Sequence, residues 1–263
     1  MNDLINIAQE VLKKTDKLIL DYFQKPLNVN WKADQSPVTI ADQKSEEIAR
    51  NFLFKETPGF GFVGEEGGYD AGDGEYHWVM DPIDGTKSFI HGVPLFGTLL
   101  ALLKNGNPIL GFIHMPALRS TVWAALGQGC FLDQEKILVS KVTNLKESLL
   151  LSGTVNTFEN KGQGDAFKNL RHACKLYRGW GDCYGYYLVL SGRAEIMVDP
   201  IVSLWDIAPM PVLFAEAGGS FSFMDGTPFN LPKNYWQQKN IVADEFTAIA
   251  SNGLLHQKVV EFF

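Results

Sequence analysis

Hydrophobic side chains recur at spacings of three and four over residues 3–23, and this period predicts an amphipathic helix. The stripe consists of Leu4, Ile5, Ala8, Val11, Leu12, Leu18, Ile19 and Tyr22. A second helix is predicted to begin after Thr39 and to end before Pro58, which places Asp42 in its first turn. Residues 31–39 between them are polar and contain a proline, so they predict a loop or a short hairpin.

From Phe60 the pattern changes to short apolar runs separated by Gly, Asn and Asp, which predicts a mainly antiparallel sheet. The runs are FGFVGEE, YHWVMD, FGTLLALL, PILGFIHM, STVWAAL and KILVS. After SLLLSG, helices and strands alternate. The predicted helices cover residues 165–177, 184–190, a run that begins at Asp206, and a closing helix to Phe263; the predicted strands cover 194–199, 218–223 and 240–244.

These elements predict an α+β fold in which helices sandwich two sheets. Because no repeat, low-complexity tract or linker interrupts the chain, we expect one compact domain over residues 1–263. Its two subregions are expected to cover about 1–145, with the larger antiparallel sheet, and 146–263, with the smaller α/β part.

Composition narrows the class of protein. The chain has 263 residues, of which 46% are hydrophobic, so it can bury a sizeable core. Its longest apolar runs, such as residues 99–103, are too short to cross a bilayer, and its first residues do not resemble a secretory signal. Three cysteines without a CxxC pair favour neither disulfides nor zinc, so we expect a cytoplasmic protein that spans no membrane.

A net charge of −7 without a basic run argues against nucleic acid as a partner. An anionic substrate would therefore need bound cations. Candidate cation ligands occur in VMDPIDGTKSF, residues 79–89, where Asp81 is expected to end an apolar strand because the proline after it cannot extend the ladder. Asp84 is expected at a helix N-cap, with the amides of Gly85 and Thr86 available to hold a phosphate. As an isolated DxxD motif, the pair would only cap a helix and close a turn.

Two further acidic positions extend this set. Glu65 and Glu66 follow an apolar strand, and Asp206 is expected at the N-cap of the helix that it begins. Each alone has an ordinary structural explanation, a solvated turn or a helix cap. Glu65 and Asp206, together with Asp81 and Asp84, form a set of hard oxygen ligands without His or Cys, which Mg²⁺ prefers. Two or three Mg²⁺ ions in such a site would bridge phosphate oxygens and lower the pKa of an attacking water, and Thr86 bonded to an acid such as Asp42 would orient that water.

The segments GEE, WVMDPIDGTKSF and LWDIAP…EAGG, in this order and at these separations, resemble the inositol-monophosphatase-like, Mg²⁺-dependent phosphatases over essentially the whole chain. The resemblance implies a layered αβαβα fold, a homodimer and hydrolysis of a small phosphate monoester. It implies metal binding by Glu65, Asp81, the Ile83 carbonyl, Asp84 and Asp206. It also implies phosphate binding by the Gly85 and Thr86 amides, activation of water by Thr86 with Asp42, and assistance from Glu66.

The segments WGDCYGYYLVLSGRAEIMVDP and DPIDGTKSFIHGVPLFGTLLALL resemble the histidinol-phosphatase branch more than the inositol branch. Asp182 and Asp199 would then offer carboxylates to a leaving group that carries an ammonium and an imidazole. The alternative is that Asp182 only caps a helix and Asp199 only binds hydroxyls. Arg178, four residues before Asp182, would either face the substrate or pair with Asp182.

The resulting hypothesis is hydrolysis of L-histidinol phosphate to L-histidinol and phosphate, a step of histidine biosynthesis. The runner-up is an inositol-1-phosphatase or a broad sugar-phosphate phosphatase. A hypothesis of a different class is a protein-interaction role with incidental catalysis, which an exposed apolar patch away from the acids would favour.

Overall fold

The computed structural model describes residues 1–25, 29–31, 37–232, 235–237 and 244–263. It confirms the two predicted N-terminal helices, α1 (Asn2–Tyr22) and α2 (Ile40–Glu56). Thr39 caps α2, as its side chain accepts a hydrogen bond from the Ala41 amide. Before α2, β1 (Val29–Trp31) and β2 (Pro37–Thr39) pair antiparallel, so residues 31–39 include the second half of a hairpin.

The larger sheet has eight strands in the order β10-β9-β8-β7-β6-β5-β3-β4. Their bounds are β3 (Gly61–Gly64), β4 (Gly68–Asp70), β5 (Tyr76–Asp84), β6 (Gly97–Lys104), β7 (Asn107–Met115), β8 (Ser120–Ala125), β9 (Gly129–Leu132) and β10 (Glu135–Ile137). The described pairs are antiparallel except β3 with β5, which are parallel. The prediction of a mainly antiparallel sheet is therefore confirmed.

The smaller sheet has five strands in the order β12-β11-β13-β15-β14. Their bounds are β11 (Leu149–Leu151), β12 (Leu176–Arg178), β13 (Ile196–Val202), β14 (Ser220–Ser222) and β15 (Phe246–Ser251). Strand β11 is parallel to both neighbours, and β15 is antiparallel to both of its neighbours. The remaining elements are α3 (Thr86–Ile90), α4 (Val155–Asn160), α5 (Gly164–Ala173), α6 (Asp182–Leu190), α7 (Leu204–Ile207), α8 (Met210–Glu216), α9 (His256–Val260) and the 3₁₀ turns Pro116–Leu118, Leu145–Glu147 and Tyr235–Gln237.

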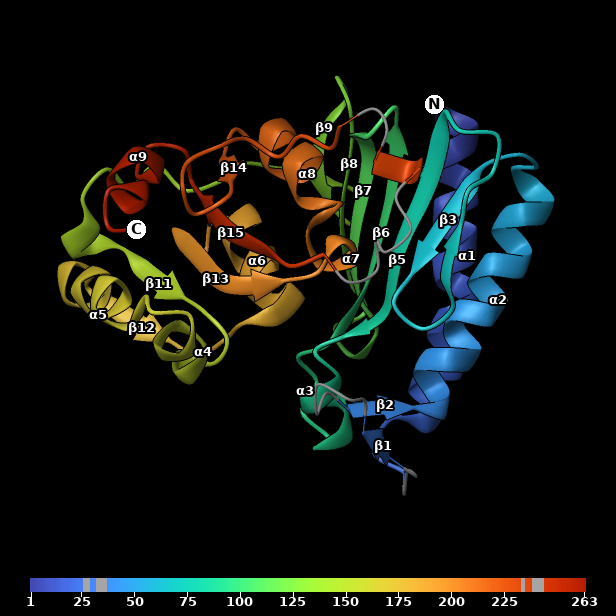
Figure 1. The fold of residues 1–263 in the computed structure, drawn as a ribbon, viewed down its shortest axis with the longest axis horizontal. Coiled ribbons are helices and arrows are strands. Elements are labelled where there is room, and N and C mark those ends of the chain that lie inside the picture. The colour runs from blue at the N-terminus through green and yellow to red at the C-terminus, as the bar shows by residue number, and fades with distance from the viewer. Residues whose placement is uncertain (26–28, 32–36, 233–234, 238–243) are drawn as a thin grey trace.

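The helices separate the two sheets and cover their outer faces (Figure 1). Helices α1 and α2 pack on the larger sheet through a core that includes Leu12, Leu53, Trp78 and Phe112. Helices α6 and α8 fill the space between the sheets, whereas α4, α5 and α9 cover the far side of the smaller sheet. This arrangement confirms the α+β class and the αβαβα layers, because each sheet buries both faces against helices.

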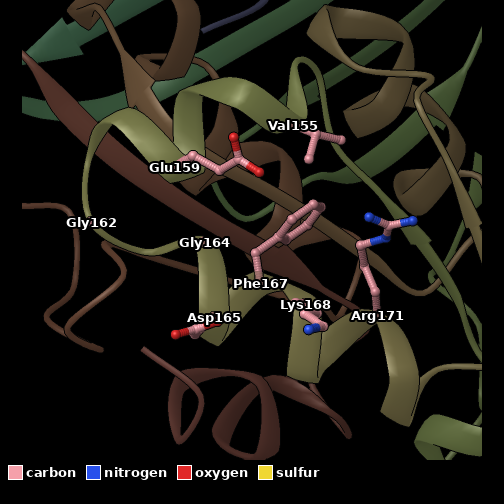
Figure 2. A pocket seen from close by; sticks show the side chains of 8 residues that line it. All are labelled: Val155, Glu159, Gly162, Gly164, Asp165, Phe167, Lys168 and Arg171. Atoms are coloured by element: carbon pink, nitrogen blue, oxygen red, sulfur yellow. The ribbon is translucent and has the colours of Figure 1, made fainter.

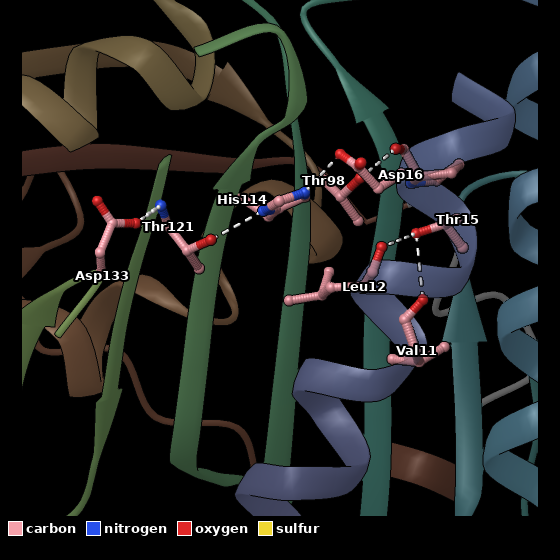
Figure 3. Close-up of polar contacts among 9 residues, drawn as sticks. Val11, Leu12, Thr15, Asp16, Thr98, His114, Thr121 and Asp133 are labelled. Carbon is pink, nitrogen blue, oxygen red and sulfur yellow. Dashed lines mark hydrogen bonds and ion pairs between the residues drawn. The ribbon is translucent and has the colours of Figure 1, made fainter. Parts of the chain in front are cut away.

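A chain of polar contacts ties α1 to the larger sheet (Figure 3). The Asp16 Oδ1 atom lies 2.9 Å from His114 Nε2, and His114 Nδ1 lies 2.8 Å from Thr121 Oγ1. His114 belongs to β7 and Thr121 to β8, so the contacts fix the helix across two strands. Within the described ranges, none of the helices combines the length and apolar character that a bilayer span requires.

Two predicted elements of the second half need correction. The helix predicted over residues 165–177 ends at Ala173, because Cys174 is extended and residues 176–178 form β12 beside β11. The helix predicted from Asp206 is two short helices, α7 and α8, on either side of Pro209. The strand predicted at 240–244 lies outside the described residues except for Asp244, and β15, which pairs with β13, begins at Phe246.

Candidate active site

The carboxyl end of β5 forms a compact corner of the backbone. The Ile83 amide donates to Asp81 Oδ1 at 2.9 Å, and the Pro82 carbonyl accepts the Thr98 hydroxyl at 2.8 Å. The prediction that the strand would end before Pro82 is wrong, because β5 continues to Asp84 with an irregular register between Asp81 and Asp84. The predicted N-cap at Asp84 is also wrong.

Gly85 occupies that N-cap position, with φ of 80° in the left-handed region. A glycine adopts this conformation without a steric cost. The Asp84 side chain consequently points away from a capping role, and one of its oxygens accepts the Cys183 amide at the start of α6. The corner of β5 is thereby joined to a helix of the second half of the chain.

Asp81, Asp84 and Asp206 form the acid trio of the site. One carboxylate oxygen from each residue lies within 4.8 Å of the other two. Asp206 is the third residue of α7 and not its N-cap as predicted; its Oδ2 accepts the Ser203 amide at 2.7 Å and so fixes the start of that helix. Because α7 follows β13 of the smaller sheet, the trio lies between the two sheets.

Burial and mutual repulsion dominate the electrostatics of this trio. The pKa of Asp81 is raised well above its usual value by burial and then by the charges of Glu65, Asp84 and Asp206. Burial raises the pKa of Asp206 to about 8, and burial and the neighbouring acids also raise the pKa of Asp84. Like charges held this close are costly without a cation. Three hard oxygen donors at this spacing fit a Mg²⁺ ion.

Glu65 and Glu66 follow β3, and Glu65 faces the trio closely enough to raise the pKa of Asp42, Asp81 and Asp206. Glu65 is not one of the three residues whose oxygens approach within 4.8 Å. Ile83, whose carbonyl was predicted as a ligand, is buried, and this carbonyl accepts the Thr86 hydroxyl at 3.0 Å.

The predicted hydrogen bond between Thr86 and Asp42 is not formed among the described residues. Asp42 Oδ2 instead accepts the Thr39 amide at 2.8 Å and the Thr39 hydroxyl at 2.6 Å, within the cap of α2. The Thr86 hydroxyl instead donates to the Ile83 carbonyl, three residues before it in the chain. Asp42 nevertheless belongs to the electrostatic environment of the trio, because burial and the Glu65 charge raise its pKa to about 6.

Asp182 and Asp199 lie on the side of the site formed by the smaller sheet. Asp182 begins α6, and its Oδ2 is 3.4 Å from the position that a Cβ atom would take on Gly85. Asp182 is exposed, although the protein around its carboxylate displaces part of its hydration and thereby raises its pKa, an effect that Lys87 opposes. Asp199 is buried and accepts the Tyr186 hydroxyl at 2.8 Å; burial raises its pKa to about 7.

Arg178 ends β12 and is exposed, and its guanidinium donates to the Tyr177 carbonyl at 2.8 Å. Among the described residues it forms no ion pair with Asp182. Cys183 and Tyr186 also contact the site, through the Asp84 and Asp199 side chains. For Tyr186, its position four residues after Asp182 on the same helix is the sequence signal that could have pointed to it.

A separate cavity of about 480 Å³ lies beside α4 and α5 (Figure 2). Both signs of charge line it, from Glu159 and Asp165 to Lys168 and Arg171. None of its lining residues belongs to the acid trio or to its neighbours, so this cavity is distinct from the candidate active site.

Comparison with known proteins agrees with the geometry. The model of the inositol monophosphatase family matches residues 1–261. A histidinol-phosphatase of Chlorobaculum parvum is 41% identical over 82% of this chain and 83% of its own length. A histidinol-phosphatase of Mycobacterium tuberculosis is 35% identical over 98% of this chain and 97% of its own length. A fructose-1,6-bisphosphatase/inositol-1-monophosphatase of Thermotoga maritima is 31% identical over 98% of this chain and 95% of its own length.

Among solved structures, an inositol monophosphatase from Zymomonas mobilis superposes with a TM-score of 0.85 at 30% identity, covering 99% of this chain and 97% of the other. The match thus extends to both sheets and to the elements that bring the acid trio together. The chain belongs to the inositol monophosphatase family and is a phosphoric monoester hydrolase.

Proposed function

We propose that this protein hydrolyses L-histidinol phosphate to L-histidinol and phosphate with Mg²⁺. The observation that carries the proposal is the position of Asp182, whose carboxylate lies beside Gly85 and close enough to Asp84 to raise its pKa. A leaving group that carries an ammonium would meet a negative charge at the edge of the acid trio. The names of the relatives from C. parvum and M. tuberculosis support the same substrate.

Two or three Mg²⁺ ions are proposed to bind at the acid trio. Carboxylate oxygens of the trio, together with Glu65 and the Ile83 carbonyl, would supply the ligands, and hard oxygen donors alone match this metal. When bound, Mg²⁺ would offset the clustered negative charge and lower the pKa of a coordinated water. The chain itself holds these ligands through the Cys183, Ser203 and Ile83 amides, so their arrangement does not depend on exposed loops.

Other groups of the corner are proposed to act on the phosphate and on water. The amides of Gly85 and Thr86 would hold phosphate oxygens at the left-handed turn between β5 and α3. Thr86, Asp42 and Glu66 are proposed to orient and deprotonate the attacking water. Since Thr86 bonds to the Ile83 carbonyl, its hydroxyl must turn for this role, whereas Asp42 is fixed by the cap of α2.

The backbone at Asp182 supports a role in recognition. Its φ is 53°, in the left-handed region, which a residue with a side chain adopts at a cost of roughly 1 kcal/mol. Asp199 is held by Tyr186, is close enough to Asp182 for that charge to raise its pKa, and is proposed as the second carboxylate toward the leaving group. Arg178 is exposed near the end of β12, and we propose that it faces the substrate.

A phosphate-release assay with Mg²⁺ tests this proposal on histidinol phosphate, inositol 1-phosphate, fructose 1,6-bisphosphate and adenosine 3′,5′-bisphosphate. We expect kcat/KM to be highest for histidinol phosphate. Equal values for all four esters would refute the assignment of substrate but leave the phosphatase activity intact.

The variant Asp182→Asn tests recognition of the leaving group. It should lower kcat/KM for histidinol phosphate by roughly tenfold or more, the scale of one charge-assisted contact, and should change inositol 1-phosphate much less. Asp165→Asn, an exposed change on α5, is the matched control. Equal losses on both substrates would exclude Asp182 from recognition.

Inositol 1-phosphate or a sugar phosphate is the second candidate substrate. The observation that favours it is the similarity to the bifunctional enzyme of T. maritima over 98% of this chain. The same panel separates the two candidates.

We further propose that residues 1–263 work as one domain, since both sheets contribute to one acid trio, and that the protein is a cytoplasmic homodimer. Light scattering of the purified protein tests the oligomeric state, and a monomeric mass would refute the dimer.

A further inference from the structure

Glu46 is a buried acid that lies outside the acid trio. It is on α2, one helical turn after Asp42, and its exposed fraction is 2%. A buried carboxylate is costly unless hydrogen bonds and a cation compensate it. The carboxylate of Glu46 has such partners: two amides of the turn between β3 and β4, which carries Glu65 and Glu66, and the Arg50 guanidinium of α2 itself.

The contacts of Glu46 hold the backbone of this turn. Its Oε2 accepts the Glu66 amide at 2.7 Å, and its Oε1 accepts the Gly67 amide at 2.6 Å. The Arg50 guanidinium, one turn further along α2, donates to Glu46 Oε1 at 3.1 Å and to the Gly68 carbonyl at 3.3 Å. Arg50 itself lies over the Phe62 ring, 4.5 Å from its centroid. Two side chains of one helix therefore fix two residues of the turn and the first residue of β4.

Two glycines allow this close approach. A Cβ atom on Gly64 would be 2.3 Å from the Glu46 carboxyl carbon, and one on Gly67 would be 2.4 Å from Glu46 Oε1. Real Cβ atoms do not come this close to other atoms, so the turn accepts the carboxylate only because both positions lack side chains. The contact therefore requires an acid at position 46 and glycines at positions 64 and 67.

We propose that Glu46 is a positioning residue for metal binding, which holds the Glu65 backbone so that the Glu65 carboxylate faces the acid trio. Helix α2 contributes Asp42 to the surroundings of the trio and, four residues later, fixes the turn that carries Glu65. Residues that orient a ligand in this way typically change metal affinity by about 10- to 100-fold when they are replaced. The inference rests on the proposed binding of Mg²⁺ at the trio.

Calorimetric titration of Mg²⁺ into Glu46→Gln tests the proposal, with Glu47→Gln as its control. Glu47 is the next residue of α2, is exposed, and undergoes the same change of charge. A glutamine at position 46 would direct its NH₂ group at one of the two amides, so one hydrogen bond is replaced by a contact between donors. We expect about tenfold weaker Mg²⁺ binding for Glu46→Gln, and a matching increase in the Mg²⁺ concentration for half-maximal activity with kcat largely retained. Wild-type affinity in Glu46→Gln would overturn the proposal.

Amide hydrogen exchange of the wild-type protein provides a test that does not depend on a variant. Without Mg²⁺, the Glu66 and Gly67 amides should exchange slowly, because Glu46 already binds them. Exchange at the rate of a free peptide, with protection only after Mg²⁺ is added, would show that the metal organises the turn and would overturn the proposal. If the wild type takes up no Mg²⁺, the proposed function fails, and the exchange rates still report separately on the contacts of Glu46.

Discussion

Replacing Asp199 by asparagine should stabilise the metal-free protein at neutral and alkaline pH. The Asp199 carboxyl is buried, and burial is the main cause that raises its pKa from 3.8 to about 7, followed by the Asp182 charge. A carboxyl with a raised pKa binds its proton more tightly in the folded state, so it lowers the free energy of unfolding as pH rises from 3.8 to about 7. Asparagine has nearly the same shape and can still accept the Tyr186 hydroxyl, but it carries no charge.

The size of the effect follows from the two pKa values. Each pKa unit corresponds to about 1.4 kcal/mol, so the ionisable Asp199 carboxyl lowers the free energy of unfolding by about 2 kcal/mol at pH 5 and by about 4 kcal/mol at pH 8. We therefore expect the stability difference between Asp199→Asn and the wild type to grow by roughly 2 kcal/mol between pH 5 and pH 8.

Urea unfolding of both proteins in the presence of a chelator, at pH 5 and pH 8, measures this difference. Asp165→Asn, which removes an exposed carboxylate on α5, serves as the control and should show no comparable growth. A constant difference between Asp199→Asn and wild type across this pH range would refute the reasoning, because it would mean that Asp199 ionises in the folded protein as easily as in water.

Three further predictions concern the site and the core. Asp84→Asn should abolish phosphate release, because the acid trio loses one of its three charges. The circular dichroism spectrum should stay unchanged, since Asp84 is half-buried and asparagine has nearly the same shape. Retained turnover would exclude Asp84 as a ligand. Mg²⁺ at about 100 times its dissociation constant should raise the free energy of unfolding by about 2.7 kcal/mol, and a calorimetric melting temperature that is the same in Mg²⁺ and in chelator would contradict this. His77 is buried against Trp236 with ring centroids 4.0 Å apart, and burial lowers its pKa from 6.5 to about 4. The stability that neutral His77 contributes is therefore present above pH 6.5 and lost as pH falls toward 4. The free energy of unfolding of His77→Gln, measured in urea, should depend on pH less than that of the wild type in this range. An equal dependence on pH in both proteins would contradict the lowered pKa of His77.

The identity of the acid trio was predictable because its members stand in short local patterns. The segment from Asp81 to Thr86 encodes its own corner, with a proline that interrupts the ladder and a glycine that takes the left-handed turn. The exact roles within the corner were not predictable. Asp84 ends the strand, and Gly85 is the cap, because the backbone bulge absorbs the proline without ending β5.

Features that depend on distant partners were missed. Residues 176–178 join the smaller sheet through β11, and their local pattern cannot distinguish this strand from the last turn of a helix. Asp42 was predicted to bond to Thr86, but the nearer Thr39 of its own helix cap occupies its Oδ2. Glu46 had a local sign, because it lies on the face of α2 that also buries Ala49 and Leu53, yet the two amides that it binds lie about twenty residues further along the chain.

The placement of the acid trio across the two sheets has a consequence for how the enzyme regains activity after denaturation. Asp81 and Asp84 come with the first sheet and Asp206 with the second, so an intermediate that has formed only one sheet possesses an incomplete set of ligands. Restored turnover would then mark the final docking of the two halves, later than the recovery of helix and strand signals. Because the docking brings carboxylates together, divalent ions and mild acidity should both hasten it.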